Sequence, residues 1–355
     1  MGHVTGFGGK EANPTRPWAR VARAAFILLS AWLLAGAPAG AQTSVKVSLD
    51  SRFEGTAAPF LLGLDKGYYR DEKLGVTIEP AANPLEPITR VAAGTHDIAF
   101  ADINAVIRHR DQNPNGAIKA VFMVYNRNPY AIIARKSRGI QAPKDLEGKK
   151  LGAPASDLAS AAWRIFAQAN GIDLSKVTVE NVGIPVREPM LAAGQLDAVT
   201  GLSFSSLVNL KDRGVPADDI VVLRMADHGV DLYGNAIIVN PKFAAEKPEA
   251  VQAFLRAFLK GLKESVRDPA HAVDSVLRRN DLAKKEVEVE RLRIAIRENI
   301  ITPEVREQGF GAVDLGHLEK SIDQLALSYE FKAKPKAADM FDASFLPDAA
   351  ERRVR

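Results

Sequence analysis

The chain has 355 residues and no cysteine, with 47 Lys or Arg against 43 Asp or Glu and a formal net charge of +4. The absence of cysteine excludes disulfides, thiolate metal sites and cysteine nucleophiles. The first 41 residues hold four Lys or Arg and one Glu, which supply +3 of this charge. The remainder is therefore nearly neutral, and a nucleic-acid-binding role loses its main support.

Residues 1–41 have the pattern of an export signal. Four basic residues precede the apolar run 24–34, and the small residues AGAPAGA follow it. The apolar run is shorter than a membrane-spanning helix requires, and no later run approaches about 18 apolar residues. We expect cleavage after Ala41 and a mature protein exported to the periplasm.

The next segment alternates between strand and helix patterns. Strands are expected at 45–49, 76–79 and 96–101, and helices at 59–66, 86–93 and 102–109. Gly67 and Gly94 are placed as the stops of the first two helices. This order of elements is typical of a parallel sheet that helices cover on both faces.

The same order recurs about one hundred residues later. AAGTHDIAF at 92–100 is followed by AAGQLDAV at 192–199, and VTIE at 76–79 is followed by VTVE at 177–180. Such internal similarity predicts two similar lobes, each with a parallel sheet flanked by helices. In the second lobe, LGAPASDLASAAWRIF at 151–166 reads as a strand end followed by a helix with Ser156 as N-cap. Its free N–H groups could cradle an anion or polar group, or the turn could hold no ligand.

Two segments are expected to cross between the lobes. AVFMVYNRNPYAIIAR at 120–135 reads as one long strand, and YGNAIIVN at 233–240 as the return. They predict a first lobe of 42–126 and 237–355 and a second of 127–236, joined by a two-strand hinge. Further helices are expected at 248–263, 270–279, 284–298 and 315–329, before a mixed tail. Ligands of open parallel sheets lie beyond the carboxyl ends of the strands, so we expect the ligand in the cleft between the lobes.

Several motifs resemble those of one family. LLGLDKGYYRDEKLGVTIE at 61–79 resembles the helix and G-L-x-V signature of periplasmic substrate-binding proteins of ABC importers, in the sulfonate, taurine, nitrate and thiamine-pyrimidine group. AAGTHDIAF, DLEGKKLGAP at 145–154, AAGQLDAV and SIDQLALSYEFKAKPKAADMFDASFLP at 321–347 extend the likeness. The resemblance implies a type II periplasmic binding fold that closes on a small molecule and docks on an inner-membrane permease with its ATPase. It implies a monomer, no cofactor, no metal and no catalysis.

Other classes remain open beside the binding protein. A yeast-type pyrimidine synthase uses the same fold but depends on a Cys-rich motif, which this chain lacks. The six His residues show no H-E-x-x-H spacing, and no G-x-S-x-G occurs. A transcription regulator would carry an N-terminal helix-turn-helix where this chain has an export signal. A periplasmic sensor cannot be separated from a transport protein by sequence.

The expected ligand contacts follow strand ends and crossings. They are Ser51, Arg52, Phe53, Asp102, Tyr125 and Asn126 from the first lobe and hinge, and Ala155, Ser156, Asp157, Gly183, Gly201, Ser203, Phe204, Tyr233 and Asn235 from the second lobe and the return crossing. Asp102 could equally cap the helix that follows it, and Asn126 could serve only the turn before Pro129.

The acidic residues of this set bear on the ligand's charge. Asp102, Asp157 and Asp231 are expected to crowd the cleft and to oppose an anion. They favour a neutral or amine-bearing ligand stacked on Phe53, Tyr125, Phe204 or Tyr233. A sulfonate, taurine or nitrate-type anion is the alternative. The opening LDSRFEG at 49–55 departs from the Trp-rich opening of the pyrimidine-binding members, so a pyrimidine ligand does not follow from the resemblance.

Overall fold

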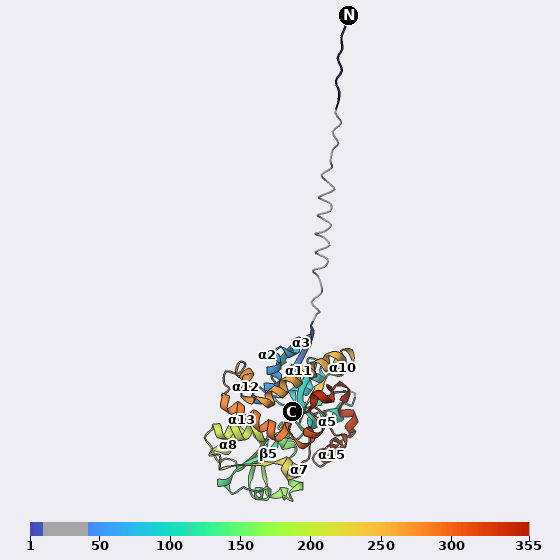
Figure 1. The fold of residues 1–355 in the computed structure, drawn as a ribbon. Coiled ribbons are helices and arrows are strands. Elements are labelled where there is room, and N and C mark those ends of the chain that lie inside the picture. The colour runs from blue at the N-terminus through green and yellow to red at the C-terminus, as the bar shows by residue number, and fades with distance from the viewer. Residues whose placement is uncertain (10–41, 115, 355) are drawn as a thin grey trace. The chain divides into compact units, whose positions relative to one another are not determined.

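The computed structural model describes residues 1–9, 42–114 and 116–354 (Figure 1). The chain divides into two compact units, 1–41 and 42–355. In the first unit, residues 1–9 form no helix or strand. The predicted apolar core and cleavage site of the export signal lie in 10–41, outside the described residues.

The first sheet has five strands in the order β2-β1-β3-β10-β4. The strands are β1 (Thr43–Ser48), β2 (Leu74–Glu79), β3 (Ile98–Asp102), β4 (Lys119–Met123) and β10 (Asn235–Val239). β1 runs parallel to β2 and β3, with Val47 opposite both Ile78 and Ile98. β10 is antiparallel to β3 and β4, between which it lies. The sheet is therefore mixed, and its one reversed strand comes late in the chain.

The second sheet repeats this plan in the order β7-β6-β8-β5-β9. The strands are β5 (Tyr130–Arg135), β6 (Lys150–Gly152), β7 (Thr178–Glu180), β8 (Ala198–Leu202) and β9 (Ile220–Arg224). β6 runs parallel to β7 and β8, and β5 is antiparallel to β8 and β9. The internal repeat is confirmed, because β1, β2 and β3 correspond in position to β6, β7 and β8.

The two crossings differ from the prediction in one respect. The segment 120–135 is not one long strand, because β4 ends at Met123 in the first sheet and β5 begins at Tyr130 in the second. The six residues between them include Pro129, which has no N–H to continue a ladder. The predicted lobe boundary after 126 lies in this link, whereas the boundary after 236 lies inside β10. The lobe limits stay a prediction.

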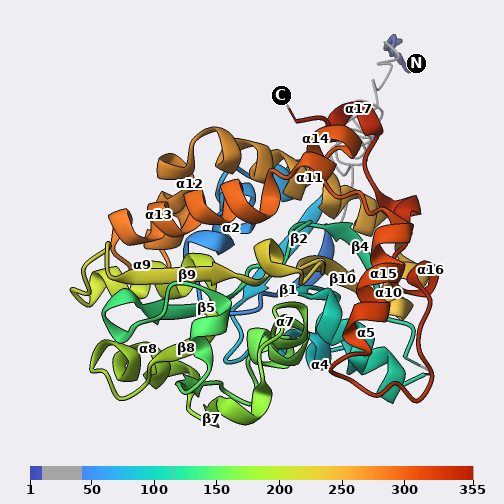
Figure 2. The ribbon, with the colours of Figure 1, turned by 90° about the horizontal axis from the view of Figure 1, so that it is seen from below.

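Helices cover both sheets. The longer ones are α2 (Ala58–Asp65), α4 (Glu86–Ala92), α5 (Ile103–Gln112), α7 (Trp163–Ala169), α8 (Ile184–Ala192), α9 (Ser203–Asp212), α11 (Pro248–Arg267), α12 (Pro269–Leu277), α13 (Lys285–Ala295) and α15 (Leu315–Leu325). The predicted helix 284–298 continues after α13 as a π-helical turn, Ile296–Ile300. Figure 2 shows α2, α11, α12 and α13 gathered on one side of the first sheet, with α15 and the C-terminal segment on another.

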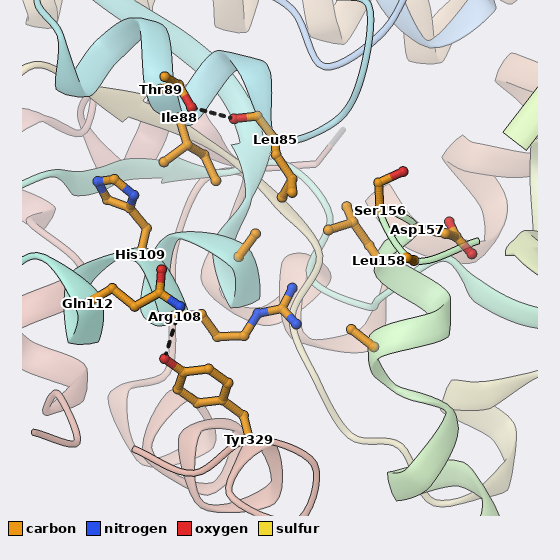
Figure 3. Close-up of a pocket in the computed structure, with 13 residues that line it drawn as sticks. Leu85, Ile88, Thr89, Arg108, His109, Gln112, Ser156, Asp157, Leu158 and Tyr329 are labelled. Carbon is orange, nitrogen blue, oxygen red and sulfur yellow. Dashed lines mark hydrogen bonds between the residues drawn. The ribbon is translucent and has the colours of Figure 1, made fainter. Parts of the chain in front are cut away.

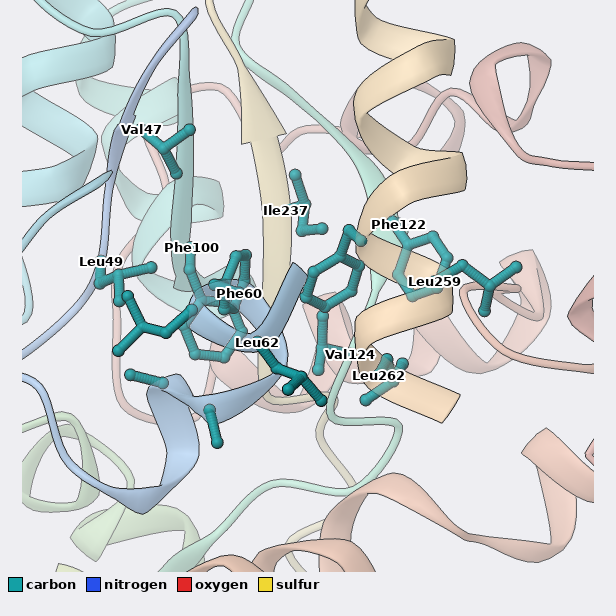
Figure 4. Close-up of a cluster of buried hydrophobic side chains, with 14 of the residues drawn as sticks. Val47, Leu49, Phe60, Leu62, Phe100, Phe122, Val124, Ile237, Leu259 and Leu262 are labelled. Atoms are coloured by element: carbon teal, nitrogen blue, oxygen red, sulfur yellow. The ribbon is translucent and has the colours of Figure 1, made fainter. Parts of the chain in front are cut away.

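The main core lies between the first sheet and the helices α2 and α11. Phe60 of α2 packs against Phe100 at 5.3 Å and Phe258 at 4.4 Å between ring centroids, and Phe122 meets Phe258 edge-on at 5.5 Å (Figure 4). Gly261 permits this approach, because a Cβ there would lie 2.3 Å from the carbonyl oxygen of Pro59. The aromatic core therefore depends on a glycine at the crossing of α2 and α11.

The strand-to-helix turn after β6 differs from the prediction. Asp157, not Ser156, occupies the N-cap position, and its side chain makes no capping hydrogen bond. The helix it begins, α6 (Leu158–Ala161), has only four residues before the chain turns at Ala162 into α7. So short a helix has little dipole, which removes the basis for a helix-terminal anion cradle at this turn.

None of the helices in the described parts of the chain combines the length and the apolar character that a membrane crossing needs.

Candidate functional site

A cavity of about 330 Å³ lies between helices that follow strands of the first sheet and the turn that follows β6 of the second. Its lining comes from α4, α5, the turn with α6, and one C-terminal residue: Leu85, Ile88, Thr89, Ala105, Arg108, His109, Gln112, Ala155, Ser156, Asp157, Leu158, Ala161 and Tyr329. The volume is within the usual range for small-molecule sites. Three predicted contacts, Ala155, Ser156 and Asp157, line it.

Helix α5 supplies the polar side of this cavity. Ala105, Arg108, His109 and Gln112 are spaced at i, i+3, i+4 and i+7, so they share one helix face. Arg108 extends from this face across the space toward the turn that carries Ser156 and Leu158 (Figure 3). Burial lowers the pKa of His109, which favours its neutral form at pH 7. Arg108 is thus the cation of the cavity wall.

Tyr329 closes the cavity from the C-terminal segment. Its hydroxyl donates to Asp111 Oδ2 at 2.9 Å and accepts from Gln112 Nε2 at 3.3 Å. Backbone N–H groups of Lys332 and Ala333 also donate to Asp111, at 3.1 and 2.6 Å. The C-terminal segment is therefore fastened to the end of α5, beside the cavity.

The carboxylate of Asp157 turns away from the cavity into a buried polar network. Its Oδ2 accepts from Thr200 Oγ1 at 2.7 Å and from Ser160 Oγ at 3.3 Å, and lies 3.2 Å from Arg187 Nη1. Arg187 Nε in turn donates to Glu188 Oε1 at 3.0 Å. Burial opposes the charge of Arg187, but both carboxylates outweigh that effect and raise its pKa. The charge of Asp157 is compensated inside the protein.

A second polar group lies at the end of β1, next to the predicted contact Ser51. Asn235 Nδ2 donates to Asp50 Oδ2 at 2.7 Å. Burial raises the pKa of Asp50 from 3.8 to about 7, although the hydrogen bond from Asn235 opposes this. Burial raises the pKa of the Tyr125 hydroxyl, and the nearby charge of Asp50 raises it further. The structure thus brings together Tyr125 and Asn235 around a carboxyl that was not predicted.

Predicted aromatic contacts are engaged with other rings. Tyr125 is 2% exposed and meets Phe100 at 5.4 Å and Phe204 at 6.0 Å, both edge-on. Phe204 lies in α9, which follows β8 of the second sheet, but its side chain packs in the hydrophobic core of the first sheet. Tyr233 is fully buried, with its ring 4.2 Å from that of His317. Stacking of a ligand on these rings stays a prediction.

Asp102 takes the alternative role that the sequence offered. It is fully buried and accepts at 3.0 Å from the N–H of Ala105 as the N-cap of α5, and Tyr130 donates to its other oxygen. Burial raises its pKa, although Tyr130 opposes the shift. Asp102 therefore fixes the start of the helix that carries Arg108.

Asn126 and Tyr233 meet in a cluster at the crossings. Asn126 Nδ2 donates to Glu304 Oε1 at 3.3 Å, and Tyr233 Oη donates to the same atom at 2.5 Å. His317 bridges Glu304 and Asp231 at 3.1 Å each, and these two carboxylates raise its pKa to about 9. This cluster ties the crossings to α14 (Pro303–Gln308) and α15.

The loop after β1 lies apart from the cavity. Ser51 Oγ donates to Asp50 Oδ1 at 3.3 Å, and the exposed Arg52 pairs with Glu54 at 2.7 Å. Phe53 is half-buried, and its carbonyl oxygen accepts from Asn280 at 2.8 Å.

The remaining predicted residues lie along α8, β8 and α9. Gly183 is exposed at the start of α8. Gly201 is buried in β8, where a Cβ would lie 2.4 Å from Ser206 Oγ. Ser203 Oγ donates to Glu298 Oε2 at 3.0 Å. None of the three lines the cavity that the described residues form.

Sequence reasoning missed most of the cavity wall. Arg108 and Gln112 lie on a charged amphipathic helix, where such residues usually face solvent, and Tyr329 is more than 200 residues away from them along the chain. The sequence does show the i, i+3, i+4, i+7 spacing that places Arg108 and Gln112 on one face of α5. That spacing does not show which other segment of the chain lies opposite this face.

A family model described as NMT1/THI5 like matches residues 55–272, more than half of the chain. The chain belongs to the NMT1/THI5-like family. Among its relatives, a formylaminopyrimidine-binding protein of Halalkalibacterium halodurans is 27% identical over 304 residues, which cover 83% of this chain and 88% of the relative. A 4-amino-5-hydroxymethyl-2-methylpyrimidine phosphate synthase of Schizosaccharomyces pombe is 24% identical over 235 residues, covering 63% and 66%. This NMT1/THI5-like chain therefore resembles both a binding protein and an enzyme.

A solved structure shows the shared fold. The alkanesulfonate-binding protein SsuA from Xanthomonas axonopodis pv. citri, bound to MOPS, superimposes with a TM-score of 0.65 at 13% identity, covering 85% of this chain and 99% of that one. The predicted two-lobed α/β fold of periplasmic binding proteins is thus confirmed for this NMT1/THI5-like chain.

Proposed function

We propose that this protein is the extracytoplasmic solute-binding component of an ABC import system, which captures a small molecule between its two sheets and delivers it to a membrane permease. One observation carries the proposal: the cavity of about 330 Å³ is lined by α4 and α5 beside the first sheet and by 155–158 beyond β6 of the second. A ligand that contacts both sides stabilises the closed arrangement, because only such contacts distinguish it from the open one.

A binding role is supported over an enzymatic one. The chain has no cysteine, whereas the synthase class that the sequence resembles depends on a Cys-rich motif. Among the described lining residues, the hydroxyl of Tyr329 is engaged with Asp111 and Gln112, and no hydroxyl is hydrogen-bonded to His109. A nucleophile activated by a neighbouring base is therefore missing from the described cavity wall.

Apolar side chains dominate the rest of the cavity wall. Leu85, Ile88 and Leu158 contribute the largest of them. A small solute with an apolar body fits this lining. The preference for a neutral or amine-bearing solute rested on crowded carboxylates, and Asp157 and Asp102 are both compensated by groups of the protein. Arg108 is therefore the lining residue whose charge bears most on the charge of the solute.

A thermal-shift screen of the purified protein against small metabolites tests this function. A solute at 100 times its dissociation constant adds about 2.7 kcal/mol of stability. Ala161→Trp fills the cavity and should abolish the shift, because Ala161 lines it. Ala193→Trp is the control, since Ala193 is exposed at the end of α8 and away from the cavity.

Three outcomes would contradict the proposal. A shift that survives Ala161→Trp unchanged would place the solute elsewhere. Conversion of the bound solute to a product, detected by mass spectrometry after incubation, would show an enzyme. The absence of neighbouring permease and ATPase genes would favour a sensor.

A further inference from the structure

Arg108 is a half-buried cation on the wall of the cavity. It makes no hydrogen bond and no ion pair with any of the described residues, although it lines the cavity and extends into it (Figure 3). Its neighbour Arg110, also half-buried on α5, donates from Nη1 to the carbonyl oxygen of Gly116 at 3.2 Å. A guanidinium that keeps its donors free beside an apolar wall is a strong binding group for an anion.

The nearby carboxylates are held by other groups. Asp102, at the start of α5, accepts from Ala105 and Tyr130. Asp111, near its end, accepts from Tyr329 and from the N–H groups of 332 and 333. Arg108 lowers the pKa of Asp102 from a distance, but no hydrogen bond joins them.

Among the residues that the structure describes, the opposite wall of the cavity offers Arg108 no partner either. Asp157 is the acidic residue of that wall, and its carboxylate accepts from Thr200 and pairs with Arg187. The cavity therefore has one uncompensated positive charge, on Arg108, among the side chains that line it in the described structure. His109 does not add a second charge at neutral pH, because burial lowers its pKa.

We propose that Arg108 binds an anionic group of the solute, a carboxylate, sulfonate or phosphate monoester, while Leu85, Ile88 and Leu158 contact its apolar body. This assignment rests on the proposed function and specifies its ligand class. The planar guanidinium can form two parallel hydrogen bonds to such a group, which a lysine cannot reproduce. The assignment reverses the neutral or amine-bearing preference that the sequence suggested.

Three aromatic probes of similar size but different charge test the assignment: benzoate, benzamide and benzylamine. Calorimetry with the whole protein should give at least tenfold tighter binding of benzoate than of benzamide. Arg108→Gln should abolish this difference, and Arg108→Lys should restore only part of it, because charge returns without the planar fork. Arg110→Gln is the matched control on the same helix and should keep it. Benzenesulfonate and phenyl phosphate then rank the three kinds of anion.

The outcomes separate this inference from the proposed function. Benzamide or benzylamine binding as tightly as benzoate, or benzoate affinity unchanged in Arg108→Gln, would overturn the assignment. Failure of every anionic probe to bind would overturn it as well. The proposed function would still stand if a neutral or amine-bearing compound bound in a manner that Ala161→Trp abolishes, and it would fall if no solute did so.

Discussion

Replacement of Asp50 by asparagine should make the protein more stable at pH 8 and leave it nearly unchanged at pH 4.5. Burial raises the pKa of Asp50 from 3.8 to about 7. Between these two values the unfolded chain loses the Asp50 proton while the folded chain keeps it. The unfolded state then binds fewer protons, so the free energy of unfolding falls as the pH rises through this window. Asparagine does not titrate and can still accept from Asn235.

The size of the effect follows from the two pKa values. The difference between 3.8 and about 7 corresponds to at most about 4 kcal/mol, at 1.36 kcal/mol for each pH unit. Asp50 is only half-buried, and solvent screens part of its charge. We therefore expect Asp50→Asn to gain about 1 to 2 kcal/mol over wild type at pH 8.

Urea unfolding of wild type and variant at several pH values from 4.5 to 8.5 measures this gain. Asp65→Asn is the control, because Arg279 and Arg278 overcome the effect of burial and lower the pKa of Asp65 to about 2. Its carboxylate stabilises the fold above pH 3.8 and loses this effect only as the pH falls toward 2, so the cost of Asp65→Asn should be constant across the range. A stability difference for Asp50→Asn that does not change with pH would refute the reasoning.

Three further variants test the fold by urea unfolding. Gly261→Ala should cost about 3 kcal/mol, because its Cβ would lie 2.3 Å from the carbonyl oxygen of Pro59. Gly183→Ala is the control and should be tolerated, because the nearest atom to its Cβ would lie 3.6 Å away. Equal costs would contradict the close approach of α2 and α11. Arg187→Met should cost about 3 to 5 kcal/mol by leaving two buried carboxylates without a cation, and a neutral result would count against that network. His317→Gln should cost about 1 kcal/mol at pH 7 and less above pH 9, because two carboxylates raise the pKa of His317 to about 9. The stability that protonated His317 contributes is complete below pH 6.5 and is lost as the pH rises through 9. A cost that persists at pH 10 would contradict this.

Local patterns predicted most of the fold. The repeat between 76–100 and 177–200 predicted two similar lobes, because apolar strands and glycine stops are encoded within short segments. The two sheets do share one strand order. The long strand over 120–135 was wrong, since each of its halves must pair in a different sheet, and pairing partners are not visible in a local pattern.

The candidate site was less predictable. Ala155, Ser156 and Asp157 were expected at a ligand site because they follow a strand end, and they do line the cavity. Arg108 was not expected, because its environment depends on a turn about fifty residues later in the chain. Arg187 was missed for the same reason. Its position against Asp157 depends on how α8 packs against β8, which no spacing in the sequence records.

The strand orders have a consequence for the order in which the protein can assemble. The second sheet is built from one continuous stretch, 130–224, whereas the first needs β10 at 235–239 between β3 and β4. The chain is synthesised from its N-terminus, so the edge of β3 that pairs with β10 stays unpaired until more than 130 further residues have been made. Such an edge can pair with other chains during that delay. The sheet that begins first is thus completed last, because its β3–β10 pairing waits for residues 235–239.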